Sequence, residues 1–374
     1  MNASAPRLRV AVVFGGRSDE HAISCATAAG VLAAIDRERF DVVPIGITRS
    51  GEWVIAADDP ERWQIGGGLL PEVPEGELGQ VTIPLGAGSS DLVVTEPGEV
   101  PRQLAGVDVV LPLLHGPFGE DGTVQGLLEL AGLPYVGSGV LASAAGMDKH
   151  YMKMLIAGAG LPTGPYTIIT PRQWRTDKAA ALDQVASLQW PVFVKPARAG
   201  SSIGITRVDD PAELEAAIVA AQRHDPKVIV EAGIEGREIE CAVLEGRGDE
   251  PPRTTLPGEI VVTDPTHGFY DYEAKYFDAG SVNLSWPAEL PPEVTDRVRF
   301  LAAETFDALG CEGLARVDFF YTPTGELIVN EINTMPGFTP FSMYPMMWQR
   351  SGLEYRDLIT ELIELALQRP TGLR

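Results

Sequence analysis

The sequence predicts a protein of α/β and α+β class, in which an N-terminal parallel α/β domain precedes two α+β units. Three observations support this prediction. Strand-length apolar runs alternate with helical stretches up to about residue 146. After that point the period changes, and shorter strands and helices follow one another. Near the C-terminus, a segment with the composition of a β-hairpin carries alternating charged residues.

The predicted N-terminal domain, residues 1–146, opens with an apolar strand, a glycine turn and a helix. We expect the strand at 8–14, the turn at Gly15-Gly16 and the helix at 22–35. Residues 66–101 are rich in Gly, Pro and acidic residues, which predicts loops or short hairpins. The other expected elements are strands at 42–47, 107–113 and 134–136 and a helix at 122–131. Because strands that alternate with helices pair in parallel, a parallel sheet is expected.

Two smaller α+β units are predicted at 147–234 and 235–374. The elements expected in the first are helices at 150–159 and 212–223 and strands at 191–195, 203–208 and 228–231. The elements expected in the second are strands at 238–244 and 255–262, a helix at 293–309, the hairpin and a terminal helix at 353–367.

The hairpin is the most informative segment of the chain. Residues 322–325 supply a proline and a glycine for its turn, and strand-forming residues flank them at 317–321 and 327–332. Folding the segment about this turn predicts that Arg316 lies opposite Glu331 and that Asp318 lies opposite Val329. In that register the polar side chains share one side of the sheet.

Arg316, Asp318, Glu331 and Asn333 therefore form a candidate site. Two carboxylates and an amide beside an arginine provide hard oxygen ligands that suit Mg²⁺. The alternative is a solvated outer strand face, on which charges also alternate.

The bulk properties narrow the class of protein. With 374 residues, of which 45% are hydrophobic, the chain is long enough for two or three domains with full cores. A net charge of −23 disfavours nucleic acid and anionic lipid as partners. The three cysteines, Cys25, Cys241 and Cys311, are far apart and indicate reduced thiols in a cytoplasmic protein. No apolar run approaches the roughly 20 residues of a membrane span, so no membrane segment is expected.

Several segments contain residues suited to an anionic nucleotide. Lys195 precedes a Gly- and Ser-rich stretch that includes Ser201 and Ser202, where backbone N–H groups and hydroxyls can contact phosphates. A plain hairpin turn is the alternative. Lys149, which begins a helix, is a further candidate. The alternative is an ordinary surface lysine. Glu231 and Glu238, near a strand end, are candidates to accept ribose hydroxyls or an adenine amino group, or are simply exposed.

Other polar residues are candidates for binding a small substrate. Glu20 precedes a helix. Its negative charge either interacts favourably with the helix dipole or binds the ammonium group of a ligand. His115 follows a strand at the edge where open α/β sheets bind ligands, although a lone histidine is more often structural. Gly337 and Ser342 offer an N–H group and a hydroxyl to a developing oxyanion, or belong to a loop shaped by prolines.

Residues 267–277 form a polar, aromatic segment with Lys275 and Tyr276. A loop of this length is often a lid that closes over a site. The alternative is a solvent-exposed loop whose tyrosines pack locally.

Seven motifs, in order from about residue 8 to 345, resemble the D-alanine–D-alanine ligase family of the ATP-grasp superfamily. They are GGRSDEHAIS, LLHGPFGEDG, GSGVLASAAGMDK, VFVKPARAGSSIG, YDYEAKY, ARVDFF and VNEINTMPGFT. The resemblance implies that the two α+β units form a two-part ATP-grasp fold. It also implies that ATP drives the joining of two D-alanines for peptidoglycan, through an acyl phosphate.

For the nucleotide, the resemblance implies roles at matched positions. Lys149 and Lys195 would contact the phosphates, and Ser201 and Ser202 would close over them. Glu231 and the backbone after it would meet the adenine, and Glu238 the ribose. In many members a lysine or a bulky residue follows the adenine glutamate, whereas this chain has Ala232-Gly233. A side-chain contact to adenine is therefore not expected there.

For the metal and the chemistry, the resemblance implies two Mg²⁺ ions, with Mn²⁺ as a substitute, on Asp318, Glu331 and Asn333. Lys275 would reach the transferred phosphate. The implied catalytic set is Glu20, Ser201, Tyr276, Arg316 and Gly337.

For the substrates, the resemblance implies that Glu20 binds the ammonium of the first D-alanine. Arg316 and the Gly337 N–H would face the tetrahedral oxyanion, and Ser342 would meet the carboxylate of the second D-alanine. His115 is expected to line the substrate site. A homodimer is also implied.

Two alternatives to a D-alanine–D-alanine ligase remain at this point. In a ligase of D-alanine and D-lactate, a histidine would be expected in the lid region, where this chain has Tyr276. A nucleotide-binding regulator without catalysis could lose its catalytic and metal-binding residues without penalty. This chain retains all four of them, Arg316, Asp318, Glu331 and Asn333.

Overall fold

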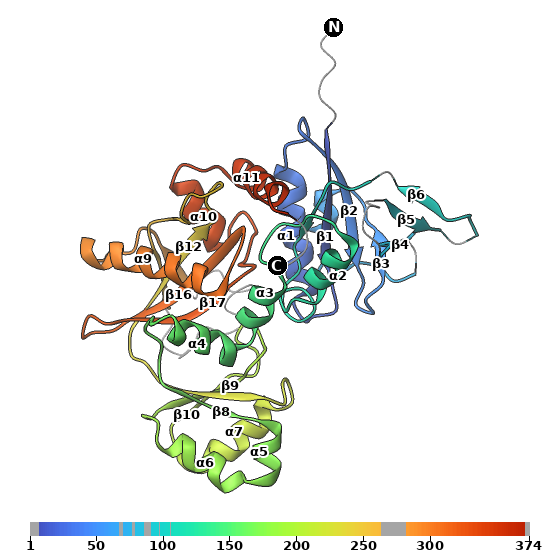
Figure 1. Ribbon diagram of the computed structural model, residues 1–374. Helices are drawn as coiled ribbons and strands as arrows, with labels where there is room; N and C mark the ends of the chain where they lie inside the picture. The colour runs from blue at the N-terminus through green and yellow to red at the C-terminus, as the bar shows by residue number, and fades with distance from the viewer. Residues whose placement is uncertain are drawn as a thin grey trace.

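The computed structural model describes residues 7–66, 70–76, 79–85, 91–96, 98–104, 106–262 and 282–370. Its strands form three sheets (Figure 1). The predicted mixture of α/β and α+β structure is confirmed. The unit boundaries at residues 146 and 234 stay predictions. None of the described helices is both long enough and apolar enough to cross a membrane.

The first sheet has the strand order β6-β5-β4-β3-β2-β1-β7. Strand β1 (Leu8–Gly15) pairs in parallel with β2 (Phe40–Ile47) and β7 (Val109–Pro112), as the alternation of strands and helices predicts. The antiparallel extension consists of β3 (Trp53–Ile55), β4 (Gln80–Thr82), β5 (Leu92–Thr95) and β6 (Arg102–Leu104). The strand expected at 134–136 is a single bridge between Val110 and Tyr135.

The N-terminal part of the chain also contains several helices. They are α1 (His21–Ala34), the short 3-10 helix η1 (Pro60–Trp63), α2 (Thr123–Ala131) and α3 (Val140–Met147). Helix α1 follows β1 directly and packs on it. The turn between them needs glycine, because Gly15 has a φ of +91° and a Cβ there would lie 2.4 Å from the Ile47 carbonyl.

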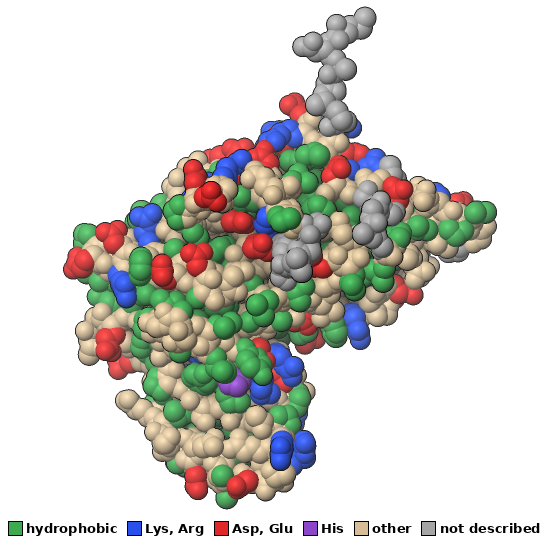
Figure 2. Space-filling model, in the orientation of Figure 1, with side chains coloured by type: hydrophobic (Ala, Val, Ile, Leu, Met, Phe, Trp, Pro, Cys, Tyr) green, Lys and Arg blue, Asp and Glu red, His purple; other side chains and the backbone are tan. Residues whose placement is uncertain are grey.

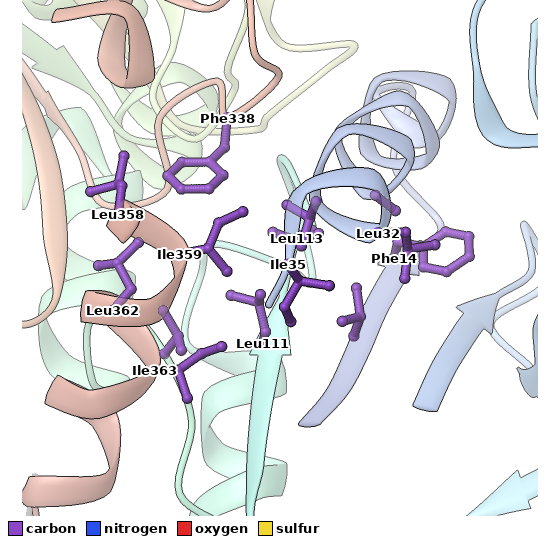
Figure 3. Close-up of a cluster of buried hydrophobic side chains, with 14 of the residues drawn as sticks. Phe14, Leu32, Ile35, Leu111, Leu113, Phe338, Leu358, Ile359, Leu362 and Ile363 are labelled. Carbon is purple, nitrogen blue, oxygen red and sulfur yellow. The ribbon is translucent and has the colours of Figure 1, made fainter. Parts of the chain in front are cut away.

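The C-terminal helix α11 (Tyr355–Gln368) returns to the N-terminal sheet (Figure 3). Leu358, Ile359, Leu362 and Ile363 recur at helical spacing and are buried in one core with residues of β1, α1 and β7. Its contacts with α1 and β7 join the two ends of the chain. The sequence predicts this helix but not where it packs.

The second sheet is antiparallel, in the order β10-β9-β11-β8. Its strands are β8 (Tyr166–Ile169), β9 (Val192–Pro196), β10 (Thr206–Val208) and β11 (Val228–Ala232). The helices α5 (Pro171–Thr176), α6 (Lys178–Ala186) and α7 (Leu214–Ala221) cover one face of it, with a 3-10 turn η2 (Pro211–Glu213) before α7 (Figure 1). Helix α5 has no buried residue, so its sequence shows no apolar periodicity and the sequence analysis does not predict it.

The third sheet has the order β15-β14-β12-β16-β17, and β13 also pairs with β12. Its strands are β12 (Arg237–Leu244), β13 (Arg253–Thr254), β14 (Gly258–Val262), β15 (Val282–Ser285), β16 (Leu314–Tyr321) and β17 (Leu327–Asn333). Helices α4 (Lys149–Gly158) and α9 (Pro292–Leu309) pack against it, and α10 (Met343–Arg350) contacts β12. The sequence does not predict α10, a short helix with a proline in its first turn.

The hairpin forms as predicted, but the predicted register is wrong. Arg316 pairs with Asn333, and Asp318 pairs with Glu331, not with Val329. One residue of the difference comes from the turn, since Tyr321 pairs with Leu327. The second comes from a bulge between Asp318 and Phe319, which makes the pairing skip one residue of β17. The predicted sharing of one face survives, because the polar residues now oppose each other directly.

The three thiols are buried, which yields a prediction. Burial raises the pKa of Cys25, Cys241 and Cys311 to about 12 each, so almost no reactive thiolate exists at neutral pH. We expect no reaction of the native protein with a disulfide reagent at pH 7.5 within minutes, and release of three equivalents after denaturation. Rapid labelling of any native thiol would contradict this burial.

Candidate functional site

One large cleft, of about 1220 Å³, is lined by residues of the second and third sheets, by α1 and by loops beside the first sheet. Every predicted site residue that the structure describes lies on its wall. They are Glu20, His115, Lys149, Lys195, Ser201, Ser202, Glu231, Glu238, Arg316, Asp318, Glu331, Asn333, Gly337 and Ser342. Lys275 and Tyr276 fall outside the described residues.

The cleft wall of this acidic protein carries both cations and carboxylates. The face seen in Figure 2 carries acidic and basic side chains interspersed over its surface. The cleft wall brings together Lys149, Lys153, Lys195, Arg207 and Arg316, beside eight carboxylates. In a protein of net charge −23, these lysines and arginines are the groups of the wall that can contact an anionic ligand.

The β16–β17 hairpin places its polar side chains in contact. The Arg316 guanidinium donates two bonds of 2.7 Å to the Asp318 carboxylate. The Asn333 side-chain amide donates to the same carboxylate at 3.0 Å. Glu331 lies across from Asp318, and its carboxylate is 3.6 Å from the Lys149 ammonium. The structure therefore unites all four residues that the sequence analysis grouped.

These donors fit a divalent cation that also binds phosphate. Among the described residues, no group of three or more His, Cys, Asp or Glu side chains is arranged to hold a metal ion. Asp318 and Glu331 are two carboxylates on the cleft wall, with the Asn333 amide beside them. Mg²⁺ characteristically takes one or two carboxylates and completes its shell with water and substrate phosphates, which matches this donor set.

Glu240, which the sequence analysis missed, completes the surroundings of Arg316. It pairs with Asp318 across β12 and β16, is buried, and places a carboxylate oxygen 3.2 Å from the Arg316 Nε. Burial disfavours the charged guanidinium, but Asp318 and Glu240 together raise the pKa of Arg316 well above its usual value. The signal was present in the sequence, since Glu238 and Glu240 are two apart on one strand.

A second missed residue, Lys153, shares Glu231 with Lys195. Its ammonium lies 2.9 Å from one Glu231 oxygen, and that of Lys195 lies 2.5 Å from the other. Lys149, one helical turn before Lys153, donates to the Ala199 carbonyl at 2.9 Å. The i, i+4 spacing of the two lysines on α4 was the available signal.

Glu20 and the serine-containing loop meet at another wall of the cleft. The Ser201 hydroxyl donates to the Glu20 carboxylate. Ser201 and Ser202 adopt φ values of 48° and 59°, a left-handed conformation that is costly for residues other than glycine. A Cβ at Gly116 would lie 2.6 Å from Glu20 Oε2, so a glycine is needed beside this carboxylate.

His115 lies in the same wall and is almost fully buried. Its Nε2 is 3.3 Å from the Thr27 hydroxyl, and its Nδ1 is 3.8 Å from Glu120. Burial alone would lower the pKa of His115, but the carboxylates of Glu120 and Glu20 raise it above its usual value.

The loop after β17 carries Gly337 and Ser342. The Ser342 hydroxyl accepts a bond from the Thr339 N–H at 3.1 Å and lies 2.8 Å from the Thr339 hydroxyl. A Cβ at Gly337 would lie 3.1 Å from this hydroxyl. Ser342 also occupies the N-cap position of α10, without a side-chain capping bond, where helix N–H groups favour a negative charge.

Of the two residues Ala232-Gly233, the structure shows why the second is a glycine. The Gly233 N–H donates to the Pro191 carbonyl at 2.8 Å, and a Cβ at Gly233 would lie 2.8 Å from that same oxygen. A larger residue would therefore displace the backbone between β9 and β11.

Comparison with known proteins agrees with these features. The family described as "D-ala D-ala ligase N-terminus" matches residues 9–138, and "D-ala D-ala ligase C-terminus" matches 155–364. A D-alanine--D-alanine ligase of Pseudarthrobacter chlorophenolicus is 61% identical over 372 residues, which cover 100% of this chain and 97% of the relative.

Two solved structures are also similar. The VanG D-Ala:D-Ser ligase from Enterococcus faecalis has a TM-score of 0.83 and 38% identity, covering 96% of this chain and 100% of that one. The D-alanine-D-alanine ligase from Coxiella burnetii has a TM-score of 0.80 and 36% identity, covering 98% and 95%.

Proposed function

Because this chain belongs to the D-alanine–D-alanine ligase family, whose members depend on ATP, we propose that its cleft joins two D-alanines into D-alanyl-D-alanine for peptidoglycan. The observation that carries the proposal is the convergence in one cleft of Asp318, Glu331 and Asn333, the buried Arg316 and several lysines. The cell-wall role places the reaction in the cytoplasm, where D-alanine and ATP are available.

In the first half of the reaction, ATP activates a poor acylating agent. A carboxylate oxygen of the first D-alanine attacks the γ-phosphorus, the bond to the β-phosphate oxygen breaks, and ADP leaves. Lys149 and Lys195 neutralise the phosphates from the cleft wall. Asp318, Glu331 and Asn333 would hold two Mg²⁺ ions, or Mn²⁺, whose charge neutralises the same oxygens.

In the second half, the amine of the second D-alanine attacks the acyl carbon. A C–N bond forms, the acyl C–O bond breaks, phosphate leaves, and the amine loses a proton. Arg316 and the Gly337 N–H stabilise the oxyanion of the tetrahedral intermediate. Glu20, bonded to Ser201, holds the first ammonium, and Ser342 at the start of α10 receives the second carboxylate.

The remaining assignments complete the proposal. Glu231 and the backbone after it meet the adenine, Glu238 meets the ribose, and His115 lines the substrate wall. Lys275 and Tyr276 act from a lid that excludes water from the acyl phosphate. The three units span 1–146, 147–234 and 235–374, the enzyme is a homodimer, and neither nucleic acid nor membrane is a partner.

Product analysis tests this proposal. We expect incubation with ATP, Mg²⁺ and D-alanine to yield one ADP, one phosphate and one D-alanyl-D-alanine for each ATP consumed. The dipeptide would be identified by mass spectrometry. Equimolar D-serine or D-lactate should compete poorly near neutral pH. ADP release that does not depend on D-alanine would contradict a ligase. A preference for D-lactate or D-serine would assign a different second substrate.

A further inference from the structure

Glu231 is held by two lysines that come from different elements. Lys153, on α4, contacts one carboxylate oxygen at 2.9 Å, and Lys195, on β9, contacts the other at 2.5 Å. The carboxylate is nearly fully buried. Burial alone would raise the pKa of Glu231, but Lys153 and Lys195 lower it well below its usual range, so the group stays ionised.

The two lysines differ in their freedom to move. The Lys153 side chain is 4% exposed, and its ammonium also donates to the Asn330 carbonyl of β17 at 3.3 Å. It is therefore anchored to two neighbouring elements. The Lys195 side chain is more exposed, at 14%, and among the described residues its ion pair is with Glu231. Of the two, Lys195 is the one able to turn toward an anionic ligand in the cleft.

The charges determine the free energy that is needed to move Lys195 away from Glu231. Two ammonium groups and one carboxylate leave a net charge of +1 facing the cleft. When Lys195 moves to a phosphate, Glu231 keeps the Lys153 ammonium as its counter-ion. Without Lys153, Glu231 and Lys195 would form a closed neutral pair, and phosphate binding would leave a buried carboxylate uncompensated, which is strongly unfavourable.

We propose that Lys153 is a positioning residue that frees Lys195 for the nucleotide phosphates by neutralising Glu231 in its place. The inference rests on the proposed function, because it requires the cleft to bind ATP. Lys153 itself contacts no phosphate in this scheme, and it acts through Glu231.

The test compares Lys153→Met with Lys153→Arg. Methionine has a similar length without the charge. It leaves the Glu231–Lys195 pair intact, so the buried Glu231 carboxylate keeps a counter-ion and the variant is expected to fold. We expect Lys153→Met to raise the KM for ATP roughly 10- to 100-fold, the scale of a charge-assisted hydrogen bond, with kcat at saturating ATP within about threefold of wild type. Lys153→Arg should restore most of the affinity.

A second arm tests whether the effect passes through Glu231. In a Glu231→Gln background the ion pair that holds Lys195 is gone, so Lys153→Met should change the KM for ATP less than threefold. Direct calorimetric titration with a non-hydrolysable ATP analogue should give the same pattern. Lys178→Met serves as the matched control, because Lys178 pairs with Glu215 on an exposed surface.

Three results would overturn the inference. Equal losses in both backgrounds would mean that Lys153 contacts the nucleotide directly. A lowered melting temperature and kcat with unchanged KM, not rescued by arginine, would mean a purely structural role. An unchanged KM in Lys153→Met would remove the effect altogether. Failure of the wild-type protein to bind the analogue or form dipeptide would instead reject the proposed function.

Discussion

Replacing Arg316 by alanine is expected to lower kcat by about 10²- to 10³-fold while the KM for ATP changes less than about tenfold. This is the usual consequence of removing one donor to an oxyanion. The guanidinium is charged and oriented by Asp318 and Glu240, so it is preorganised for a charge that develops only during acyl transfer. Steady-state kinetics with each substrate varied in turn would separate the two effects.

Stability must be measured alongside the kinetics of the Arg316 variant. Removing one partner of a buried ion pair costs about 3–5 kcal/mol, because Asp318 and Glu240 would lose their shared cation. Arg316→Lys is the matched control, since it keeps the charge but not the two parallel bonds to Asp318. A change confined to ATP affinity in Arg316→Ala would argue against an oxyanion role.

Replacing Glu331 by glutamine is expected to weaken Mg²⁺ binding and turnover far more than folding. A lost charge-assisted contact is worth about 1.5–3 kcal/mol, or roughly 10- to 100-fold in the Mg²⁺ concentration for half-maximal rate. The folding cost is smaller, because the substitution preserves the shape of the side chain and the ion pair with Lys149 is long, at 3.6 Å. Magnesium titration of ADP release and thermal unfolding would measure both.

The control for this variant lies on the same hairpin. Glu326→Gln changes an exposed carboxylate beside the turn and should alter neither magnesium dependence nor turnover. Equal proportional losses of thermal stability and activity in Glu331→Gln would assign Glu331 a structural role.

Much of the fold follows from local sequence signals. The β1–α1 opening and the β16–β17 hairpin combine apolar period with turn residues, so sequence alone locates them well. Helices α5 and α10 are too short to show a full apolar period, and the sequence analysis missed both. The packing of α11 on the first sheet depends on contacts between the two ends of the chain, which no local pattern encodes.

The candidate site, like the fold, could be predicted from the sequence only in part. The family motifs identify the residues that line the cleft, including Lys195 and Asp318. They do not reveal that a bulge sets Asp318 opposite Glu331, because a bulge depends on the pairing of two strands. Lys153 and Glu240 were missed although each lies at a regular spacing from a predicted site residue, because spacing alone does not identify Glu231 and Arg316 as their partners.

Isotope transfer tests the acyl-phosphate ligase mechanism most directly. D-alanine labelled with ¹⁸O in its carboxylate would be incubated with the enzyme, ATP and Mg²⁺, and the released phosphate analysed by mass spectrometry. If the carboxylate attacks ATP and the acyl C–O bond then breaks, one ¹⁸O enters phosphate for each dipeptide formed. Dipeptide formation with unlabelled phosphate would contradict the mechanism.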